Sequence, residues 1–353
     1  MMIPRRTALS VLGAMYAASL ANVQAGGRPS QERIRIGQIG TTHAHATKLS
    51  VYRQSSDYEV VGVVEPDPVR RQQAEQKDAF RGVNWMSAEQ LLNQPELQAV
   101  LIETDVCDLL SNAEQCVKAG LHVHIDKPAG ESLDHLRRIL TIADEQKLMV
   151  QMGYMYRYNP AIRMLRQMLK DGWLGEIFEV HTVMSKVVDP SARRELAKYP
   201  GGMMFELGCH IMDLVIGVLG RPESVTSFAK HTSTLDDGLK DNMLAVLDYP
   251  KATATVKTSA MEVEGFDRRH LVVCGTEGTF HIQPLDNPSA RLSLSQPRGS
   301  WKAETQEVTF PKYTRYIDDA ADMAQVIRGE KPSDFTSQHD LLVQETLLKA
   351  CGL

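Results

Sequence analysis

Short apolar segments alternate with helical segments from residue 33 to residue 155, and this alternation limits the possible folds more than any other feature of the chain. The apolar segments are RIRIGQIG (33–40), YEVVGVVEPD (58–67), LQAVLIETD (97–105), LHVHIDKP (121–128) and MVQMGYM (149–155). The helical segments between them are HATKLSVYRQ (45–54), PVRRQQAEQKDAF (68–80), LLSNAEQCVKAG (109–120) and ESLDHLRRILTIADEQKL (131–148). Strands that alternate with helices of this length predict a doubly wound parallel sheet, a Rossmann domain, over residues 33–150.

The pattern changes after residue 150. One more helix is expected at NPAIRMLRQMLKDGWLG (159–175), and strand-like segments then follow one another with one helix, MMFELGCHIMDLVIGVLG (203–220), among them. The strand-like segments begin at residues 176, 223, 242, 252, 269 and 290. Consecutive strands without crossover helices predict an α+β domain over residues 151–353 with a large, open, mainly antiparallel sheet. Helices return at the end, and we expect that the last one could pack back on the first domain.

The first 25 residues have the layout of a secretory signal. A basic start with Arg5 and Arg6 precedes the short apolar run TALSVLGAMYAASLA, and cleavage is expected after Ala25. The arginine pair resembles a twin-arginine signal, although Ala8 stands where a phenylalanine is usual. The sequence therefore predicts a flexible linker over residues 26–32 and a periplasmic or otherwise exported protein.

Charge and hydropathy exclude two kinds of partner. The formal net charge is −5, and no basic stripe is available to neutralise phosphates, so we expect no nucleic-acid partner. No apolar run reaches the roughly 20 residues that span a bilayer, so we expect no membrane span. The five cysteines are scattered without a C-x-x-C pair, which indicates neither a disulfide framework nor a cysteine zinc site.

The turn after the first strand departs from the dinucleotide-binding pattern G-x-G-x-x-G. Gly40 keeps the first glycine, but Thr42 and His45 stand at the second and third positions. The helix N-terminus still offers free N–H groups to an anion, and Thr41, Thr42 and His43 could add donors. We therefore expect bound NAD in a displaced or tightly held pose.

Two further residues are expected along the cofactor. Glu65 ends the second strand 25 positions after Gly40, where a carboxylate accepts from the ribose hydroxyls and repels a 2′-phosphate. This favours NAD over NADP. Thr104 follows the third apolar segment, at the same edge of the predicted sheet, and is expected to contact the cofactor.

Two short motifs carry acid–base residues. In HVHIDKPAG, Asp126 and Lys127 lie at the carboxyl end of a parallel strand, where open α/β sheets bind ligands. In YPGGMMFELGCHIMDLV, the residues Glu206, His210 and Asp213 are spaced by four and three, which on a helix places them on one side. Histidine is the natural base for an alcohol proton near neutral pH, and either acid could orient it.

With these motifs in order, the chain resembles the Gfo/Idh/MocA family, the glucose–fructose oxidoreductase and inositol dehydrogenase group. The resemblance rests on DKPAG (126–130), where the family usually has E-K-P, on GGMMFELGCHIMD (201–213), on YRYNPAI (156–162) and on GTEGTF (275–280). It implies that Lys127 and His210 act at the nicotinamide on a hydroxyl of a sugar or polyol, and that the protein is a homodimer or homotetramer. Asp126 replaces the usual Glu and Glu206 the usual Asp, and both changes keep the charge.

The second domain is expected to contribute to the same cleft. Arg157, Tyr158 and Asn159, from the YRYNPAI segment, are expected to line it, and Glu206 and Asp213 to orient His210 or to bind neighbouring hydroxyls. Together with Lys127 and His210, these residues form the predicted substrate site.

Other functions and a metal are also considered. His43 with His45, and His122 with His124, form two H-x-H pairs that could chelate a metal. The first pair is expected in a turn and helix, where residues i and i+2 diverge, and the second inside a sheet, so we predict no metal. A carbohydrate lyase or hydrolase that uses the same His and Lys, and a non-catalytic sugar-binding protein, remain alternatives to the oxidoreductase.

Overall fold

The computed structural model describes residues 32–353, and Ile34–Leu353 form one compact unit. The predicted export signal (1–25) and nearly all of the predicted linker (26–32) lie outside the described residues. The predicted domain boundary near residue 150 stays a prediction, because both sheets belong to this single unit.

The first sheet has six strands, all parallel, in the order β3-β2-β1-β4-β5-β6. The strands are β1 (Ile34–Ile39), β2 (Tyr58–Val64), β3 (Trp85–Met86), β4 (Ala99–Ile102), β5 (His122–Ile125) and β6 (Val150–Met152). This order is that of the Rossmann fold, with its reversal between β1 and β4, and it confirms the predicted fold class. Strand β3 was not predicted, because two residues carry no readable periodicity.

Helices of different length connect these strands. They are the 3-10 helix η1 (Ala46–Lys48), α2 (Leu49–Gln54), α3 (Pro68–Glu75), the 3-10 helix η2 (Asp78–Phe80), α4 (Ala88–Leu92), α5 (Val106–Lys118) and α6 (Leu133–Gln146). Helix α5 buries one apolar face, from Val106 to Val117, against the sheet, as its 3.6-residue periodicity requires. The first crossover differs most from the prediction, because six irregular residues and a 3-10 turn precede the short α2.

The second sheet has eight strands in the order β14-β13-β12-β11-β7-β10-β9-β8. They are β7 (Ile177–Ser185), β8 (Ser224–Lys230), β9 (Asn242–Asp248), β10 (Thr253–Ser259), β11 (His270–Gly275), β12 (Gly278–Ile282), β13 (Ser289–Leu294) and β14 (Thr305–Thr309). Only the β7–β10 pair is parallel, so the prediction of a mainly antiparallel sheet is confirmed. The segment 269–282 forms a hairpin of two strands, and β14 was not predicted.

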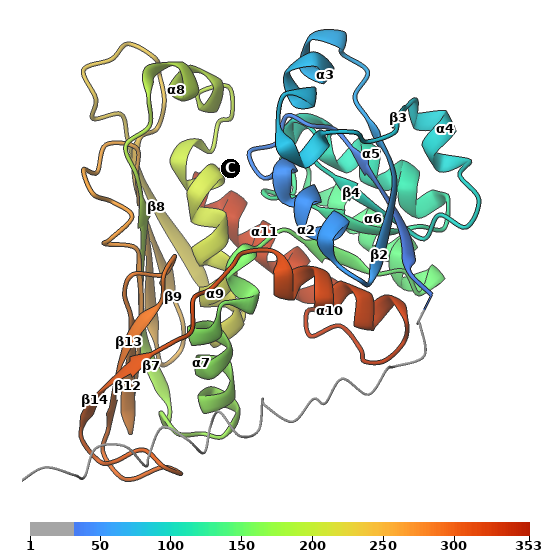
Figure 1. Ribbon diagram of the computed structural model, residues 1–353. Coiled ribbons are helices and arrows are strands. Elements are labelled where there is room, and N and C mark those ends of the chain that lie inside the picture. Colours follow the sequence, from blue (N-terminus) through green and yellow to red (C-terminus); the bar gives the residue numbers. More distant parts are fainter. Residues whose placement is uncertain (1–31) are drawn as a thin grey trace, which may run out of the picture. The chain divides into compact units, whose positions relative to one another are not determined.

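Helices lie along one face of this sheet (Figure 1). The helices after β6 are the 3-10 helix η3 (Met155–Tyr158), α7 (Pro160–Lys170), α8 (Pro190–Leu196), the π-helix η4 (Met204–Gly208), α9 (Cys209–Leu219), α10 (Ile317–Ile327) and α11 (Ser337–Cys351). Helix α9 is buried over nearly its whole length, from Cys209 to Ile216, because it lies between β7 and α11. Within residues 32–353, no helix combines the length and the apolar character that crossing a membrane requires.

The two C-terminal helices bind to elements of the first sheet. The hydroxyl of Tyr58 in β2 donates to the carbonyl of Ala320 in α10 at 2.7 Å. Ser337, at the start of α11, donates to Asp144 of α6 at 2.7 Å. The end of the chain therefore fixes elements that lie 262 and 193 residues earlier in the sequence.

Asp319 in α10 gives a test of this packing. Its side chain is buried, one carboxylate oxygen lacks a hydrogen-bond partner, and burial raises the pKa of the carboxyl to about 7. A raised pKa means that the folded state keeps a proton that the unfolded state has released, so stability is lost as the pH rises from about 4 to 7. Asp319→Asn should raise the free energy of unfolding at pH 8 by on the order of a few kcal/mol.

At pH 4 the same substitution should give no gain, because the carboxyl is then protonated in the folded protein. Urea unfolding followed by circular dichroism measures both values. The control is Asp318→Asn, whose side chain is 47% exposed and which should change little at either pH. An equal effect of Asp319→Asn at pH 4 and pH 8 would contradict the role of burial.

Candidate active site

Gly40 makes the turn at the end of β1. Its φ is +91°, and a Cβ added there would lie 2.6 Å from the backbone nitrogen of Thr104 and 2.7 Å from the carbonyl oxygen of Glu103. Its N–H donates to the carbonyl of Val64 at 2.8 Å. Only glycine fits both the conformation and the space, so Gly40 has the role that the first glycine of a dinucleotide turn has.

A cavity of about 500 Å³ opens beside this turn, between the carboxyl ends of β1, β2 and β4. Its walls include Gly40, Thr42, Glu65 and Thr104, four of the residues that were predicted to bind the cofactor. This is the crevice where Rossmann sheets hold the adenosine half of a dinucleotide, and a glycine cradle with a strand-end carboxylate fits that group. Thr41 departs from the prediction, because its hydroxyl donates to Glu65 at 2.6 Å and is therefore not free for a diphosphate.

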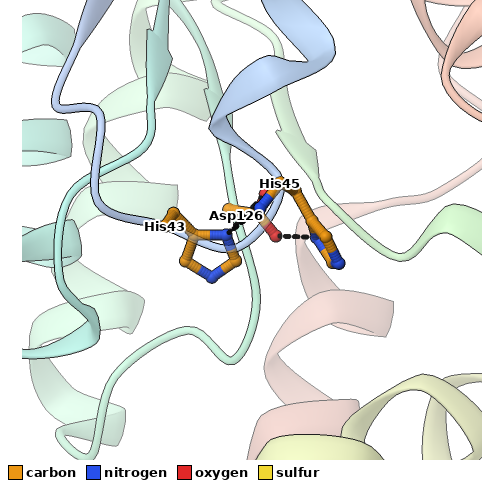
Figure 2. Close-up of side chains that lie close together, drawn as sticks. All are labelled: His43, His45 and Asp126. Carbon is orange, nitrogen blue, oxygen red and sulfur yellow. Dashed lines mark hydrogen bonds and ion pairs between the residues drawn. The ribbon is translucent and has the colours of Figure 1, made fainter. Parts of the chain in front are cut away.

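His43 and His45 converge on Asp126 (Figure 2). The Nδ1 atom of His43 lies 3.1 Å from Oδ2 of Asp126, and the Nδ1 atom of His45 lies 3.1 Å from Oδ1 of the same carboxylate. The expectation that these two histidines diverge was wrong. Residues 41–45 form an irregular turn and the first helix begins only at Ala46, so His45 lies outside any helix.

Asp126 has two further donors. Lys48 donates to Oδ2 at 2.7 Å, and the backbone N–H of Lys127 donates to Oδ1 at 2.7 Å. Burial raises the pKa of Asp126, but His43, Lys48 and His45 outweigh it and hold the pKa well below its usual value. The carboxylate is therefore ionised, and it joins the turn after β1 to the end of β5.

Lys48 is the centre of a buried network. Its ammonium donates to Nε2 of His124 at 2.7 Å and lies 3.0 Å from Oε1 of Glu103. Burial lowers its pKa, but Asp126 and Glu103 outweigh this, so the pKa lies above its usual value. His124 in turn donates from Nδ1 to Gln151 at 2.8 Å.

Lys48 and Glu103 were not among the predicted site residues, and His124 was considered only as a possible metal ligand. A signal was present, because Glu103 and Asp126 directly follow the buried strands β4 and β5, and both strands end at the edge that the H-A-H-x-x-K segment faces. Parallel strands that end side by side bring their next residues together.

Lys127, which follows β5, and Glu206, in the π-helix η4, are brought together. The ammonium of Lys127 lies 3.2 Å from Oε1 of Glu206 and donates to its carbonyl oxygen at 3.1 Å. Burial lowers the pKa of Lys127, but Glu206 outweighs it and the pKa is raised. Burial likewise raises the pKa of Glu206, but Lys127 outweighs it and the pKa is lowered, so the pair is ionised.

His210 is buried beside aromatic rings. Its ring centroid lies 5.8 Å from that of Tyr156, 6.1 Å from that of His45 and 6.3 Å from that of Tyr154. Burial, with the positive charge of Lys127 nearby, holds its pKa well below the usual value, so the imidazole is neutral. Its Nδ1 has no hydrogen-bond partner among the described residues.

The predicted orientation of His210 by Glu206 or Asp213 is therefore not seen. Glu206 lies in the π-helix Met204–Gly208 and pairs with Lys127, whereas His210 lies in the following helix α9. Asp213 instead accepts from Arg157 at 2.6 Å and from His339 at 2.9 Å, and these partners lower its pKa to about 2 against the effect of burial. The spacing of Glu206, His210 and Asp213 correctly predicted a helical segment, but it did not predict that Asp213 binds Arg157 and that Glu206 binds Lys127.

The three YRYNPAI residues also have structural partners. Arg157 pairs with Asp213 and Asp340, Tyr158 donates to Asp322 at 2.7 Å, and Asn159 caps the N-terminus of α7. Arg157, Asp213 and His339 line a separate cavity of about 170 Å³ whose walls do not include Lys127, Glu206 or His210. The structure thus does not bring Arg157, Tyr158 and Asn159 to the Lys127–Glu206 pair.

Two domain models of known families match this chain. Residues 34–154 match the oxidoreductase family with an NAD-binding Rossmann fold, and residues 162–281 match the Gfo/Idh/MocA C-terminal domain. The chain belongs to the Gfo/Idh/MocA family of oxidoreductases. The resemblance inferred from the sequence motifs is thereby confirmed.

The family match extends to individual proteins. The chain is 26% identical to inositol 2-dehydrogenase of Rhizobium meliloti (strain 1021) over 248 residues, 69% of this chain and 72% of that protein. It is 25% identical to the uncharacterized oxidoreductase YhhX of Escherichia coli (strain K12) over 225 residues, 63% of each chain, so it spans less than two thirds of that relative. The solved UDP-N-acetylglucosamine 3-dehydrogenase GnnA of Acidithiobacillus ferrooxidans has the same fold, with a TM-score of 0.75 at 19% identity over 91% of this chain and 97% of that one.

The fit of Gly40 in its turn can be tested by a matched pair of variants. Gly40→Ala places a methyl group against the backbone of Thr104 at a positive φ, whereas Gly82→Ala, at φ +69°, meets nothing within 4 Å. Both should lose the roughly 1–2 kcal/mol of a left-handed residue, and Gly40→Ala should lose clearly more in urea unfolding. Equal losses would show that the turn has room for a side chain.

Proposed function

We propose that the protein is an NAD-dependent oxidoreductase that acts on a secondary hydroxyl of a sugar, polyol or glycoside. One observation carries the proposal: buried Lys127 is paired with Glu206 at 3.2 Å, and four residues after Glu206 the buried His210 has an Nδ1 with no hydrogen-bond partner among the described residues. Both Lys127 and His210 belong to the motifs that mark this oxidoreductase family. An ammonium next to a neutral imidazole can polarise a hydroxyl oxygen and accept its proton.

The cofactor would be held by the cavity at the Gly40 turn. Gly40 lets the backbone approach, Thr42 and Thr104 line the cavity, and Glu65 at the end of β2 is placed for the ribose hydroxyls. A carboxylate in that position supports NAD rather than NADP. When bound, NAD supplies the hydride acceptor or donor.

The residues of the chain would handle the proton and the charge. His210 would take the hydroxyl proton, since its Nδ1 is neutral and has no partner among the described residues. Lys127 would donate to the same oxygen and stabilise the negative charge that develops on it. Glu206 would hold the ammonium in place and, with its side chain 20% exposed, offer an oxygen to a second hydroxyl.

Sugars and polyols are the substrate class that relatives favour. One relative is an inositol 2-dehydrogenase, and a structural neighbour is a dehydrogenase of UDP-N-acetylglucosamine. We propose a homo-oligomer that associates through the second sheet, where Phe178 in β7 and Phe228 in β8 are 46% and 50% exposed.

Export would affect the use of the cofactor. We propose, from the signal-like residues 1–25, that the protein acts in the periplasm or an equivalent space, where free NAD is scarce. The cofactor would then have to stay bound and be regenerated by a second substrate, so that one sugar is oxidised and another reduced.

The proposal predicts that purified protein, once denatured, releases NAD or NADH, which mass spectrometry and absorbance identify. His210→Ala and Lys127→Ala should each lower turnover on an active sugar by about 10²–10⁴-fold, because each removes a positioned acid–base group. Both should keep bound cofactor, since neither residue lines the cavity at Gly40.

The matched control is Lys198→Ala, which removes a lysine whose side chain is 66% exposed and should leave turnover unchanged. Circular dichroism and thermal unfolding check that each variant is folded. Absence of nicotinamide cofactor even after reconstitution would contradict the proposal, and would favour a carbohydrate lyase or hydrolase or a sugar-binding protein. Full activity in both site variants would refute the roles given to Lys127 and His210.

A further inference from the structure

We propose that His43, His45 and Asp126 bind a divalent transition-metal ion of the Zn²⁺ class. The inference goes beyond the proposed function and does not depend on it. The sequence analysis predicted no metal here because the two histidines were expected to diverge, and that reason no longer holds.

Three clusters of metal-ligating side chains occur within residues 32–353, each with its ligand atoms within 4.8 Å of one another. They are Glu103–His124–Asp126, Asp213–His339–Asp340 and His43–His45–Asp126. The first already surrounds the ammonium of Lys48, and the second surrounds the guanidinium of Arg157. In the third cluster Lys48 donates to Oδ2 of Asp126 at 2.7 Å, but neither imidazole is hydrogen-bonded to a cationic side chain.

The spacing of the third cluster suits a coordination sphere. Each Nδ1 atom lies 3.1 Å from an oxygen of Asp126. Ligands about 2.0–2.2 Å from a zinc ion are separated from one another by roughly 3–3.5 Å. An ion could thus be bound with small side-chain movements, and Figure 2 shows both rings directed toward the one carboxylate.

Hydrogen bonds to His43 fix which of its nitrogens faces Asp126. Its Nε2 faces the carbonyl oxygen of Lys127 at 3.0 Å, and a carbonyl only accepts, so Nε2 carries the proton. The Nδ1 atom accepts the backbone N–H of His45 at 3.2 Å. Nδ1 also lies 3.1 Å from a carboxylate oxygen of Asp126, a distance that a proton on Nδ1 or a metal ion between the two atoms would satisfy. A backbone carbonyl on the far ring nitrogen is also the usual outer partner of a metal-bound histidine.

Two buried carboxyl groups lie beside the proposed ligands. The carboxylates of Glu103 and Asp126 are both fully buried, and Lys48 is the single ammonium that they share, because Lys127 is paired with Glu206. One oxygen of Glu103 lies 3.0 Å from the ammonium of Lys48, and the other lies 3.7 Å from Nδ1 of His43. Burial and Asp126 raise the pKa of Glu103 to about 8, so near neutral pH a proton on this carboxyl offsets one of the two charges when no metal is bound.

The ligand set indicates the class of metal. Two imidazoles with one carboxylate suit Zn²⁺, Fe²⁺, Co²⁺ or Ni²⁺ better than Mg²⁺ or Ca²⁺, which prefer oxygen ligands. Three protein ligands leave a position for water or substrate, as in catalytic zinc sites. The side chain of His45 is 14% exposed, so solvent reaches the edge of the cluster.

The test uses the full chain, freed of metal by a chelator and then titrated with Zn²⁺ by calorimetry and with Co²⁺ by visible absorption. We expect one ion per chain and the absorption of a low-symmetry Co²⁺ site. His43→Ala and His45→Ala should each weaken Zn²⁺ binding by more than about 100-fold, since even outer-partner losses cost roughly 10–100-fold. The control is His135→Ala, which removes a histidine of α6 that pairs with Glu114 outside the cluster.

A second measurement needs no variant. In the unaltered protein, bound Zn²⁺ should protect His43 and His45 from diethylpyrocarbonate, read by mass spectrometry, while His135 stays reactive. The proposal would be overturned if the unaltered protein bound no metal. It would also be overturned if both cluster variants bound metal as tightly as the unaltered protein and Zn²⁺ gave the two histidines no protection. Metal binding is measured without substrate or nicotinamide. A negative result would therefore leave the test of the oxidoreductase, which measures released cofactor, unaffected.

Discussion

The buried carboxylate of Asp126 is the interaction on which the candidate site depends. Its two oxygens meet Lys48, His43, His45 and the backbone N–H of Lys127. These partners come from the turn after β1 and from the end of β5, two strands that are not hydrogen-bonded neighbours in the sheet. Removing one member of a buried ion pair typically costs about 3–5 kcal/mol, because the other charge is left without compensation.

Lys127 connects this network to the second sheet. Its backbone N–H binds Asp126, its carbonyl oxygen accepts from His43, and its ammonium binds Glu206. Glu206 lies in the π-helix that leads into α9. Its contact with Lys127 therefore joins this wide helical turn to the end of β5. π-helical turns are frequent at functional sites, and this one sets the direction of an acid toward the lysine.

Much of the fold could be predicted from the sequence, because periodicity and crossover length report strand and helix order directly. The strands β3 and β14 could not be predicted, because β3 has two residues and β14 is mostly polar. Each is defined by its hydrogen bonds to a neighbouring strand. The motifs located Lys127, Glu206 and His210, but spacing alone assigned Asp213 to His210 although Arg157 holds it. The convergence of His43 and His45 was missed because it depends on the irregular turn 41–45, in which both side chains contact Asp126.

Hydrogen exchange in Asp126→Asn tests the central role of this carboxylate most directly. The variant removes the charge that Lys48 and His43 face, so amides of residues 41–48 should exchange about 100-fold faster or more, as a loss of roughly 3 kcal/mol implies. Amides in β9 and β11 of the second sheet should keep their protection, and Asp134→Asn, whose side chain is 86% exposed, should leave all of them unchanged. Unchanged protection of residues 41–48, or an equal loss in both sheets, would contradict the account.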